Sequence, residues 1–328
     1  MNEPHAAYAS PQGEVVPLET LRRDAVKRGG GKGANLGELI TAGLDVPPGF
    51  CVTTAAYRGA VVEAGLAGVI DEALRDVRAD DPGSAEAAST RIAMFFEDLP
   101  LPSDLTEAIL AAYGALGTLA VAVRSSATTE DLPGASFAGQ QATLLNVRGE
   151  DELLAAVRHC WGSLWSARAI TYRQRQGFRH DQPAIAVVVQ RLVTAEVSGI
   201  LFTANPVTGG RDEIVVNAAL GLGEAIVGGL TTPDSFTLDR ATLAVRERQT
   251  GRQEVETVPA ERGTTERLLG PERAAQPALT DTQLARLAEI GINVEHLFGS
   301  PQDIEGARRR PLLGTPDAPD HQPATSAA

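Results

Sequence analysis

The segment from Leu119 to Val147 constrains the fold most, because it joins two strand-like runs through a loop of small and polar residues. It has the sequence LAVAVRSSATTEDLPGASFAGQQATLLNV. The alternating apolar run Leu119–Val123 predicts a β-strand that ends on Arg124, followed by a polar turn that begins at Ser125. The run Ala142–Val147 predicts the returning strand. The segment is therefore expected to form a hairpin.

Two interpretations of this hairpin remain open. A guanidinium at a strand end can grip phosphate oxygens with its planar fork, and small loop residues let backbone N–H groups approach the same anion. Arg124 would then be a phosphate ligand. The alternative is a surface hairpin with an exposed arginine, since loops of small residues are common.

A glycine run with a lysine forms a second candidate anion site. Residues Arg28–Leu36 are RGGGKGANL, and Lys32 is one of only two lysines in the chain, the other being Lys27. Backbone N–H groups at the start of a helix attract phosphate, and the segment from Gly37 to Ala42 is predicted to be a short helix. The run is not a P-loop, because a glycine follows Lys32 where that motif has Ser or Thr. A flexible turn without a ligand is the alternative.

The remaining elements are predicted from periodicity. The near-continuous apolar run Ala184–Val193 predicts a central strand, and Glu150–Arg175 predicts one long helix with an apolar side. Thr280 is expected to cap a helix through Leu297. The stretch from Gly251 to Pro277 is expected to be irregular.

A carboxylate pair lies near the end of the chain. Asp303 and Glu305 are two residues apart, so on a strand both side chains point to one face. Such a pair can bind Mg²⁺ when phosphate oxygens complete the octahedron. The alternative is a solvated strand edge.

Composition limits the function classes. The 328-residue chain carries a net charge of −13, which argues against broad electrostatic binding to nucleic acid or to an anionic membrane. Its two cysteines are far apart in sequence, and no signal peptide or membrane-spanning run is recognisable, so a reducing, cytoplasmic location is expected. Residues 1–13 are expected to form a flexible leader, and residues 308–328 a disordered tail rich in Pro and Ala.

Taken together, the motifs resemble a known family. In chain order they are GGGKGANLGEL, VPPGF, VAVRSSATTEDLPGASFAGQQATLLNV, WGSLWSARAITYR, VVVQRLV, SGILFTANP, GLGE and PQDIE. This series resembles the nucleotide-binding domain of the pyruvate phosphate dikinase and phosphoenolpyruvate synthase family, which rifampicin phosphotransferases share. The resemblance extends from Val26 to Glu305.

The resemblance implies an α+β, ATP-grasp fold in which two lobes, residues 14–190 and 191–307, clamp ATP. By motif position, Lys32 and Arg124 would contact the ATP phosphates as catalytic residues, and the metal ligands would be Asp303 and Glu305, with Glu305 also contacting the nucleotide. The other implied nucleotide-binding residues are Gly139 and Thr143 in a phosphate-covering loop and Gln190, Leu192 and Val193 in a hinge against the adenine.

The implied activity is Mg²⁺-assisted phosphoryl transfer from ATP to a histidine on a separate domain or partner protein, as in pyruvate, water dikinases. The lone chain is expected to be incomplete, because none of its histidines has the small-residue context of the family's acceptor. The family's Gln and Arg after the D-I-E motif are also absent or displaced, since no glutamine follows Glu305 until Gln322. A non-catalytic nucleotide-binding module and an ATP-grasp ligase remain as alternatives.

Overall fold

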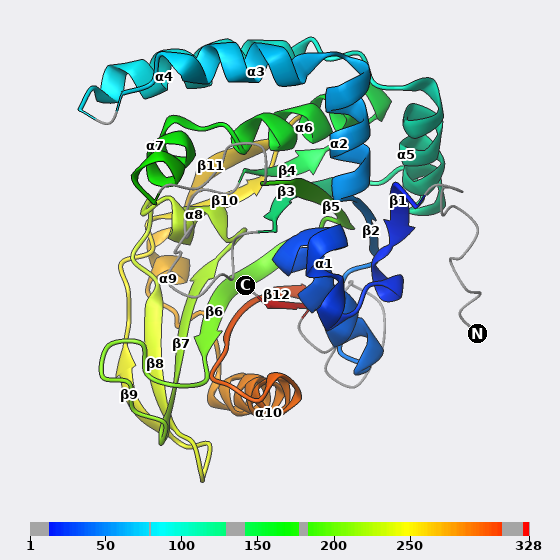
Figure 1. Ribbon diagram of the computed structural model, residues 1–328. Helices are drawn as coiled ribbons and strands as arrows, with labels where there is room; N and C mark the ends of the chain where they lie inside the picture. Colours follow the sequence, from blue (N-terminus) through cyan, green and yellow to red (C-terminus); the bar gives the residue numbers. More distant parts are fainter. Residues whose placement is uncertain (1–12, 79, 129–141, 177–182, 310–323, 328) are drawn as a thin grey trace. The chain divides into compact units, whose positions relative to one another are not determined.

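The computed structural model describes residues 13–78, 80–128, 142–176, 183–309 and 324–327 (Figure 1). The chain divides into two compact units. The first comprises Met1–Glu38 and Pro48–Leu192, and the second comprises Leu39–Pro47 and Val193–Ala328. Each unit combines helices with a β-sheet, which confirms the predicted α+β class. The division differs from the expected lobes in assigning Leu39–Pro47 to the second unit.

The first unit is built on a five-stranded antiparallel sheet in the order β1-β2-β5-β3-β4. Its strands are β1 (Val15–Pro17), β2 (Gly49–Val52), β3 (Val121–Ala127), β4 (Thr143–Val147) and β5 (Ile185–Arg191). Strand β5 lies between β2 and β3 in the centre of the sheet, which confirms the prediction from its apolar run. A central strand that is buried on both faces needs apolar side chains at successive positions.

One face of this sheet forms the main hydrophobic core. Alternate residues such as Val121, Val123 and Val187 join it, and they are fully buried. Helices supply the rest of this core: α2 (Thr54–Glu63), α3 (Leu66–Arg75), α4 (Pro82–Glu97), α5 (Ser103–Ala115), α6 (Glu150–Ser163) and α7 (Ala167–Gln176).

The single long helix predicted over Glu150–Arg175 is wrong, because α6 and α7 are separate helices. The chain turns between them at Trp165, and the hydroxyl of Ser166 accepts a hydrogen bond from the N–H of Ala169 in the first turn of α7 (3.3 Å). The turn places the Trp165 ring in the core, where its Nε1 donates to the hydroxyl of Tyr57 (3.1 Å). Burial of a large aromatic ring thus decides a break that helical periodicity could not predict.

The second unit is built on a six-stranded sheet in the order β13-β12-β6-β7-β8-β9. Its strands are β6 (Ala195–Phe202), β7 (Glu213–Leu220), β8 (Asp234–Asp239), β9 (Val245–Gln249), β12 (Asp303–Arg309) and β13 (Ala324–Ala327). Helix α10 (Asp281–Phe298) begins at the predicted cap, where Thr280 and Gln283 form a reciprocal capping box.

The stretch after Gly251 is more regular than predicted. Strands β10 (Val255–Pro259) and β11 (Thr264–Leu268) form an antiparallel hairpin, and α9 (Pro271–Ala274) follows it. A short helix, α8 (Glu224–Val227), packs near β10, and its Glu224 accepts a hydrogen bond from the hydroxyl of Thr264 (2.7 Å). Pairing with a neighbouring segment therefore orders a polar sequence that has little strand pattern of its own.

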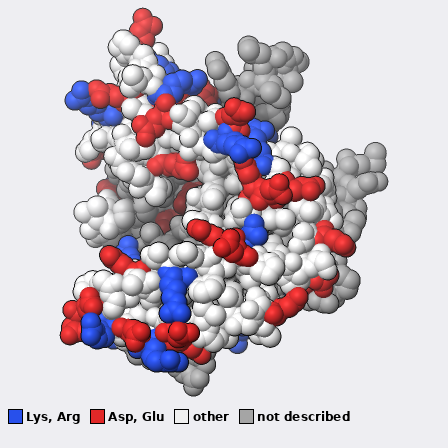
Figure 2. Space-filling model, turned by 90° about the horizontal axis from the view of Figure 1, so that it is seen from above, with Lys and Arg blue, Asp and Glu red and all other residues white. Residues whose placement is uncertain are grey.

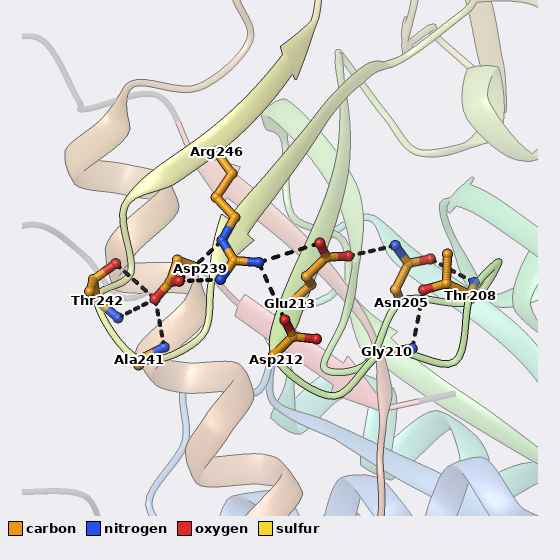
Figure 3. A network of polar contacts seen from close by, with 9 residues as sticks. All are labelled: Asn205, Thr208, Gly210, Asp212, Glu213, Asp239, Ala241, Thr242 and Arg246. Carbon is orange, nitrogen blue, oxygen red and sulfur yellow. Dashed lines mark hydrogen bonds and ion pairs between the residues drawn. The ribbon is translucent and has the colours of Figure 1, made fainter.

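A polar network joins the turns at one end of strands β7, β8 and β9 (Figure 3). Arg246 forms ion pairs with Asp239 and, at 3.4 Å each, with Asp212 and Glu213. Asn205 donates a hydrogen bond to Glu213 (2.9 Å). The carboxylates of these neighbouring segments would repel one another. Arg246 offsets that repulsion and so favours the pairing of the strands that carry them.

The end of the chain also differs from the expected tail. Strand β12 continues to Arg309, beyond the predicted limit of 307, and Ala324–Ala327 pair with it as β13. Backbone hydrogen bonds to a sheet edge do not need apolar side chains, so the composition of the tail did not reveal this strand. Residues 310–323 lie outside the described part. Of the helices that the structure describes, none combines the length and apolar character needed to cross a membrane.

Both thiols are expected to be unreactive in the folded protein. Cys51 and Cys160 are fully buried, and burial raises the pKa of both, that of Cys51 to about 12. We expect a thiol-specific reagent at pH 8 to modify neither cysteine on the timescale of minutes, and to modify both once denaturant is added. Rapid modification of either thiol in the native protein would contradict the burial described here.

Candidate functional site

The glycine run lies inside a helix rather than in a flexible turn. Helix α1 (Val26–Thr41) spans it, with one break at Gly30, whose φ of 68° and ψ of 176° are outside the helical range. The prediction of a turn followed by a short helix from Gly37 is therefore wrong, because helical residues lie on both sides of Gly30. Such a backbone conformation is essentially restricted to glycine. Lys32 is half-buried and lies just after the break.

Strand β3 is longer than the sequence suggested. It continues past Arg124 through Ser125 and Ser126 to Ala127, so the predicted polar turn does not begin at Ser125. Both serines are buried, and each pairs with a residue of β5. Hydrogen bonding across the sheet overrides the turn preference of serine here. Arg124 is consequently within a strand, half-buried, and not at the end of one.

The sheet register brings three of the predicted nucleotide-binding residues to one face. Arg124 pairs with Thr143 on β4 and with Val188 on β5, while Gln190 pairs with Ala122, two residues before Arg124. Directly paired residues on antiparallel strands point to the same face, and residues two apart on one strand share that face. Arg124, Thr143 and Gln190 therefore project from the face opposite the main core.

Helix α1 covers part of that same face. A Cβ atom placed on Gly33 would lie 3.6 Å from the Sγ of Cys51 and 3.7 Å from the Cγ2 of Val188. A Cβ on Gly30 would lie 2.2 Å from the carbonyl oxygen of Ser126. The segment that carries Lys32 is thus packed against the strand that carries Arg124 (Figure 1).

The other predicted nucleotide-binding residues are at the C-terminal end of β5, at the start of β4 and in the segment before β4. Gln190 is buried, and the N–H of Leu192 donates to the carbonyl of Ala120 (2.9 Å). The chain passes from the first unit to the second between Leu192 and Val193. Thr143 is exposed at the start of β4. Gly139 lies outside the described residues.

In the second unit, Asp303 and Glu305 occupy alternate positions of β12 and so share a face of its sheet, with the buried Ile304 between them. Their partners on β6 are Phe202 and Ile200. Among the described residues, no group of three or more His, Cys, Asp or Glu side chains is arranged to hold a metal ion. The pair supplies the hard oxygen donors that Mg²⁺ prefers, and the ion would need further ligands from phosphates or water.

The arginines that follow this pair are not equivalent. Arg308 points to the opposite face of β12 and binds Glu196 (2.7 Å), which also binds Arg273 (3.1 Å). Arg308 is therefore engaged in an ion-pair cluster with Glu196 and Arg273. A register shift separates Arg308 from Arg309.

Comparison with known proteins identifies the domain. The family model described as "Pyruvate phosphate dikinase, AMP/ATP-binding domain" matches residues 26–310. The chain belongs to this family. The match covers α1, both strands of the predicted hairpin and the carboxylates of β12.

Several curated relatives are similar over most of the chain. A probable phosphoenolpyruvate synthase of Methanocaldococcus jannaschii is 43% identical over 300 residues, which cover 89% of this chain and 25% of the relative. The phosphoenolpyruvate synthase of Pyrococcus furiosus is 40% identical over 335 residues, covering 88% of this chain and 41% of the relative. A rifampicin phosphotransferase of Streptomyces sviceus is 45% identical over 293 residues, which cover 89% of this chain and 34% of the relative. The chain thus spans a quarter to less than half of these relatives.

Ser126 is not evident from the sequence as a residue of the candidate site. The sequence predicts a polar turn at Ser126, but it is a fully buried strand residue in contact with the glycine break. The alternation of apolar residues stops at Val123, so the strand pattern gave no signal beyond that point. The isolated glycine run, which often marks a close backbone approach, was the available signal.

Proposed function

We propose that this domain adopts an ATP-grasp fold, binds Mg-ATP and transfers a phosphoryl group. The observation that supports the proposal best is the packing of the broken helix with Lys32 over the sheet face that carries Arg124, Thr143 and Gln190. A compact ammonium and a planar guanidinium on one side of a sheet suit the two kinds of contact that a polyphosphate makes.

In this proposal each residue has a separate task. Lys32 and Arg124 neutralise the phosphate oxygens as negative charge shifts during transfer, and the backbone around Gln190 and Leu192 holds the adenine. Asp303 and Glu305 would hold Mg²⁺, which would supply positive charge that offsets the negative charge of the phosphates. Thr143 and Gly139 would complete the cover over the phosphates.

The acceptor in this proposal is a histidine on a separate domain or a partner protein. The relatives are named synthases and phosphotransferases, and these names are the reason for preferring a phosphotransferase to a non-catalytic module. This chain would therefore take the phosphoryl group from ATP, and another polypeptide or domain would accept and use that group.

Nucleotide preference provides the first test. We expect Mg-ATP to raise the melting temperature more than Mg-GTP at equal concentration, because backbone groups at the hinge match the adenine edge and mismatch that of guanine. Stabilisation follows the logarithm of ligand concentration over Kd, so a tenfold difference in affinity is about 1.4 kcal/mol at saturation. Equal stabilisation by the two nucleotides would contradict the assignment of Gln190, Leu192 and Val193 to the adenine.

Transfer itself is tested with labelled ATP. The chain is incubated with Mg-ATP and a separately produced phosphohistidine domain of this family, and acid-labile label on that domain is measured. Label that depends on an intact Lys32 supports the proposal. ATP binding without any label transfer would refute the phosphotransferase step and leave a binding domain.

A further inference from the structure

The break in α1 lies directly against Ser126 of β3. Gly30 adopts a conformation that other residues avoid, and a Cβ atom there would lie 2.2 Å from both the Oγ and the carbonyl oxygen of Ser126. The backbone of α1 therefore approaches β3 more closely than any side chain at this position would allow. Ser126 is 0% exposed, so water does not compete at this contact.

The hydroxyl of Ser126 connects the two sides of the break. It donates a hydrogen bond to the carbonyl of Gly29 (2.8 Å), before the break, and accepts one from the N–H of Gly33 (3.3 Å), after it. An interrupted helix leaves carbonyls of its first part and N–H groups of its second part without helical partners. A single buried hydroxyl, which can both donate and accept, supplies one partner to each part.

We propose that Ser126 is a positioning residue that fixes Lys32 relative to Arg124 for phosphate binding. Lys32 lies between the two backbone groups that the hydroxyl holds, Gly29 and Gly33. Arg124 lies two residues before Ser126 on the same strand and the same face. The Ser126 side chain thus positions Lys32, and it does so from the strand that also carries Arg124. This inference rests on the proposed function, in which both cations bind ATP phosphates.

Phosphate binding requires that Lys32 be held in an accurate position, which is a different requirement from the stability of the fold. A binding group displaced by a fraction of an ångström loses much of its interaction with a rigid ligand, so the supporting contacts of a site determine its affinity. Ser126 touches no substrate in this scheme, and its effect on ATP must pass through Lys32.

A double-mutant cycle on the full chain tests this route, with Kd for Mg-ATP and for adenosine measured by calorimetry. We expect Ser126→Ala to raise the Kd for ATP about tenfold and to change the Kd for adenosine less than twofold. In a Lys32→Ala background, Ser126→Ala should raise the Kd for ATP less than twofold further, because the residue through which it acts is gone. Additive effects, or equal losses for ATP and adenosine, would overturn the proposal.

A matched control separates positioning from general destabilisation. Thr54 is 3% exposed, and its hydroxyl donates to the carbonyl of Lys27 (2.7 Å), on the same helix but before the break. Thr54→Val should lower the melting temperature to a similar degree as Ser126→Ala and leave the Kd for ATP within twofold. A tenfold loss of ATP affinity in Thr54→Val would refute the specific role of Ser126.

Three further outcomes separate the positioning role of Ser126 from the proposed function. If Ser126→Ala does not fold, the same cycle with Ser126→Cys decides, because the thiol retains weak hydrogen bonding and should give an intermediate, Lys32-dependent loss. If Lys32→Ala itself binds ATP normally, the proposed function fails. If Lys32→Ala binds weakly while Ser126→Ala binds normally, only the positioning role fails.

Discussion

Replacing Lys32 by alanine is expected to weaken Mg-ATP binding about ten- to hundredfold. Hydrogen bonds to charged groups contribute roughly 1.5–3 kcal/mol each, which corresponds to this range in Kd. Arg124→Ala should cause a loss of the same order, since its guanidinium lies on the sheet face covered by α1. Neither substitution should unfold the protein, because both side chains are only half-buried.

The controls for this prediction are within α1. Lys27→Ala removes the only other lysine, which is exposed and precedes the break at Gly30, and it should bind ATP normally. Lys32→Arg should also bind poorly, because a planar guanidinium cannot replace a compact ammonium in a fitted position. If Lys27→Ala and Lys32→Ala bind ATP equally well by calorimetry, Lys32 is not a phosphate ligand.

The largest loss of stability is expected from Asp234→Ala in the second unit. Asp234 is 0% exposed and lies on β8. Its Oδ1 accepts from the N–H of Gly251 (2.8 Å) and its Oδ2 from the N–H of Ala278 (2.7 Å). One carboxylate therefore holds the segment after β9 and the segment before α10 to the sheet.

Removing that carboxylate leaves the buried N–H of Ala278 and the half-buried N–H of Gly251 without this acceptor. At roughly 1.5–3 kcal/mol for each hydrogen bond to a charged group, the expected loss in the free energy of unfolding is about 3–6 kcal/mol. Denaturant unfolding followed by circular dichroism measures it. Asp234→Asn retains one acceptor oxygen and should lose less.

Asp281→Ala serves as the control for Asp234. Its side chain is 69% exposed and its partner Arg248 is also at the surface, so the change in stability should be within about 0.5 kcal/mol. A similar loss in Asp234→Ala and Asp281→Ala would show that the two hydrogen bonds of Asp234 do not stabilise the second unit.

The sequence predicts the net charge of the protein but not how the charged side chains are distributed over its surface. The net charge of −13 follows from composition, whereas Figure 2 shows acidic and basic side chains intermingled on the face that it views. The Arg246 cluster illustrates why, since its carboxylates come from residues 212, 213 and 239 and meet only through strand pairing. Long-range pairing is not encoded in local patterns.

The sequence by itself determined the α+β class, the central strand β5, the capped helix α10 and the family. These depend on local signals: an apolar run, a capping box, and motifs in a fixed order. It also located Lys32 and Arg124 as candidate phosphate ligands, since a glycine run and an isolated arginine are visible without a fold.

Only the tertiary structure decided how those residues are held. The register of β3 with β4 and β5 places Arg124, Thr143 and Gln190 on one face, and a shift of one residue would have placed them in the core. The break at Gly30 exists because β3 lies against it, and Ser126 is a strand residue because β5 pairs with it. Contacts between segments about a hundred residues apart set these positions, and no local pattern in either segment contains them.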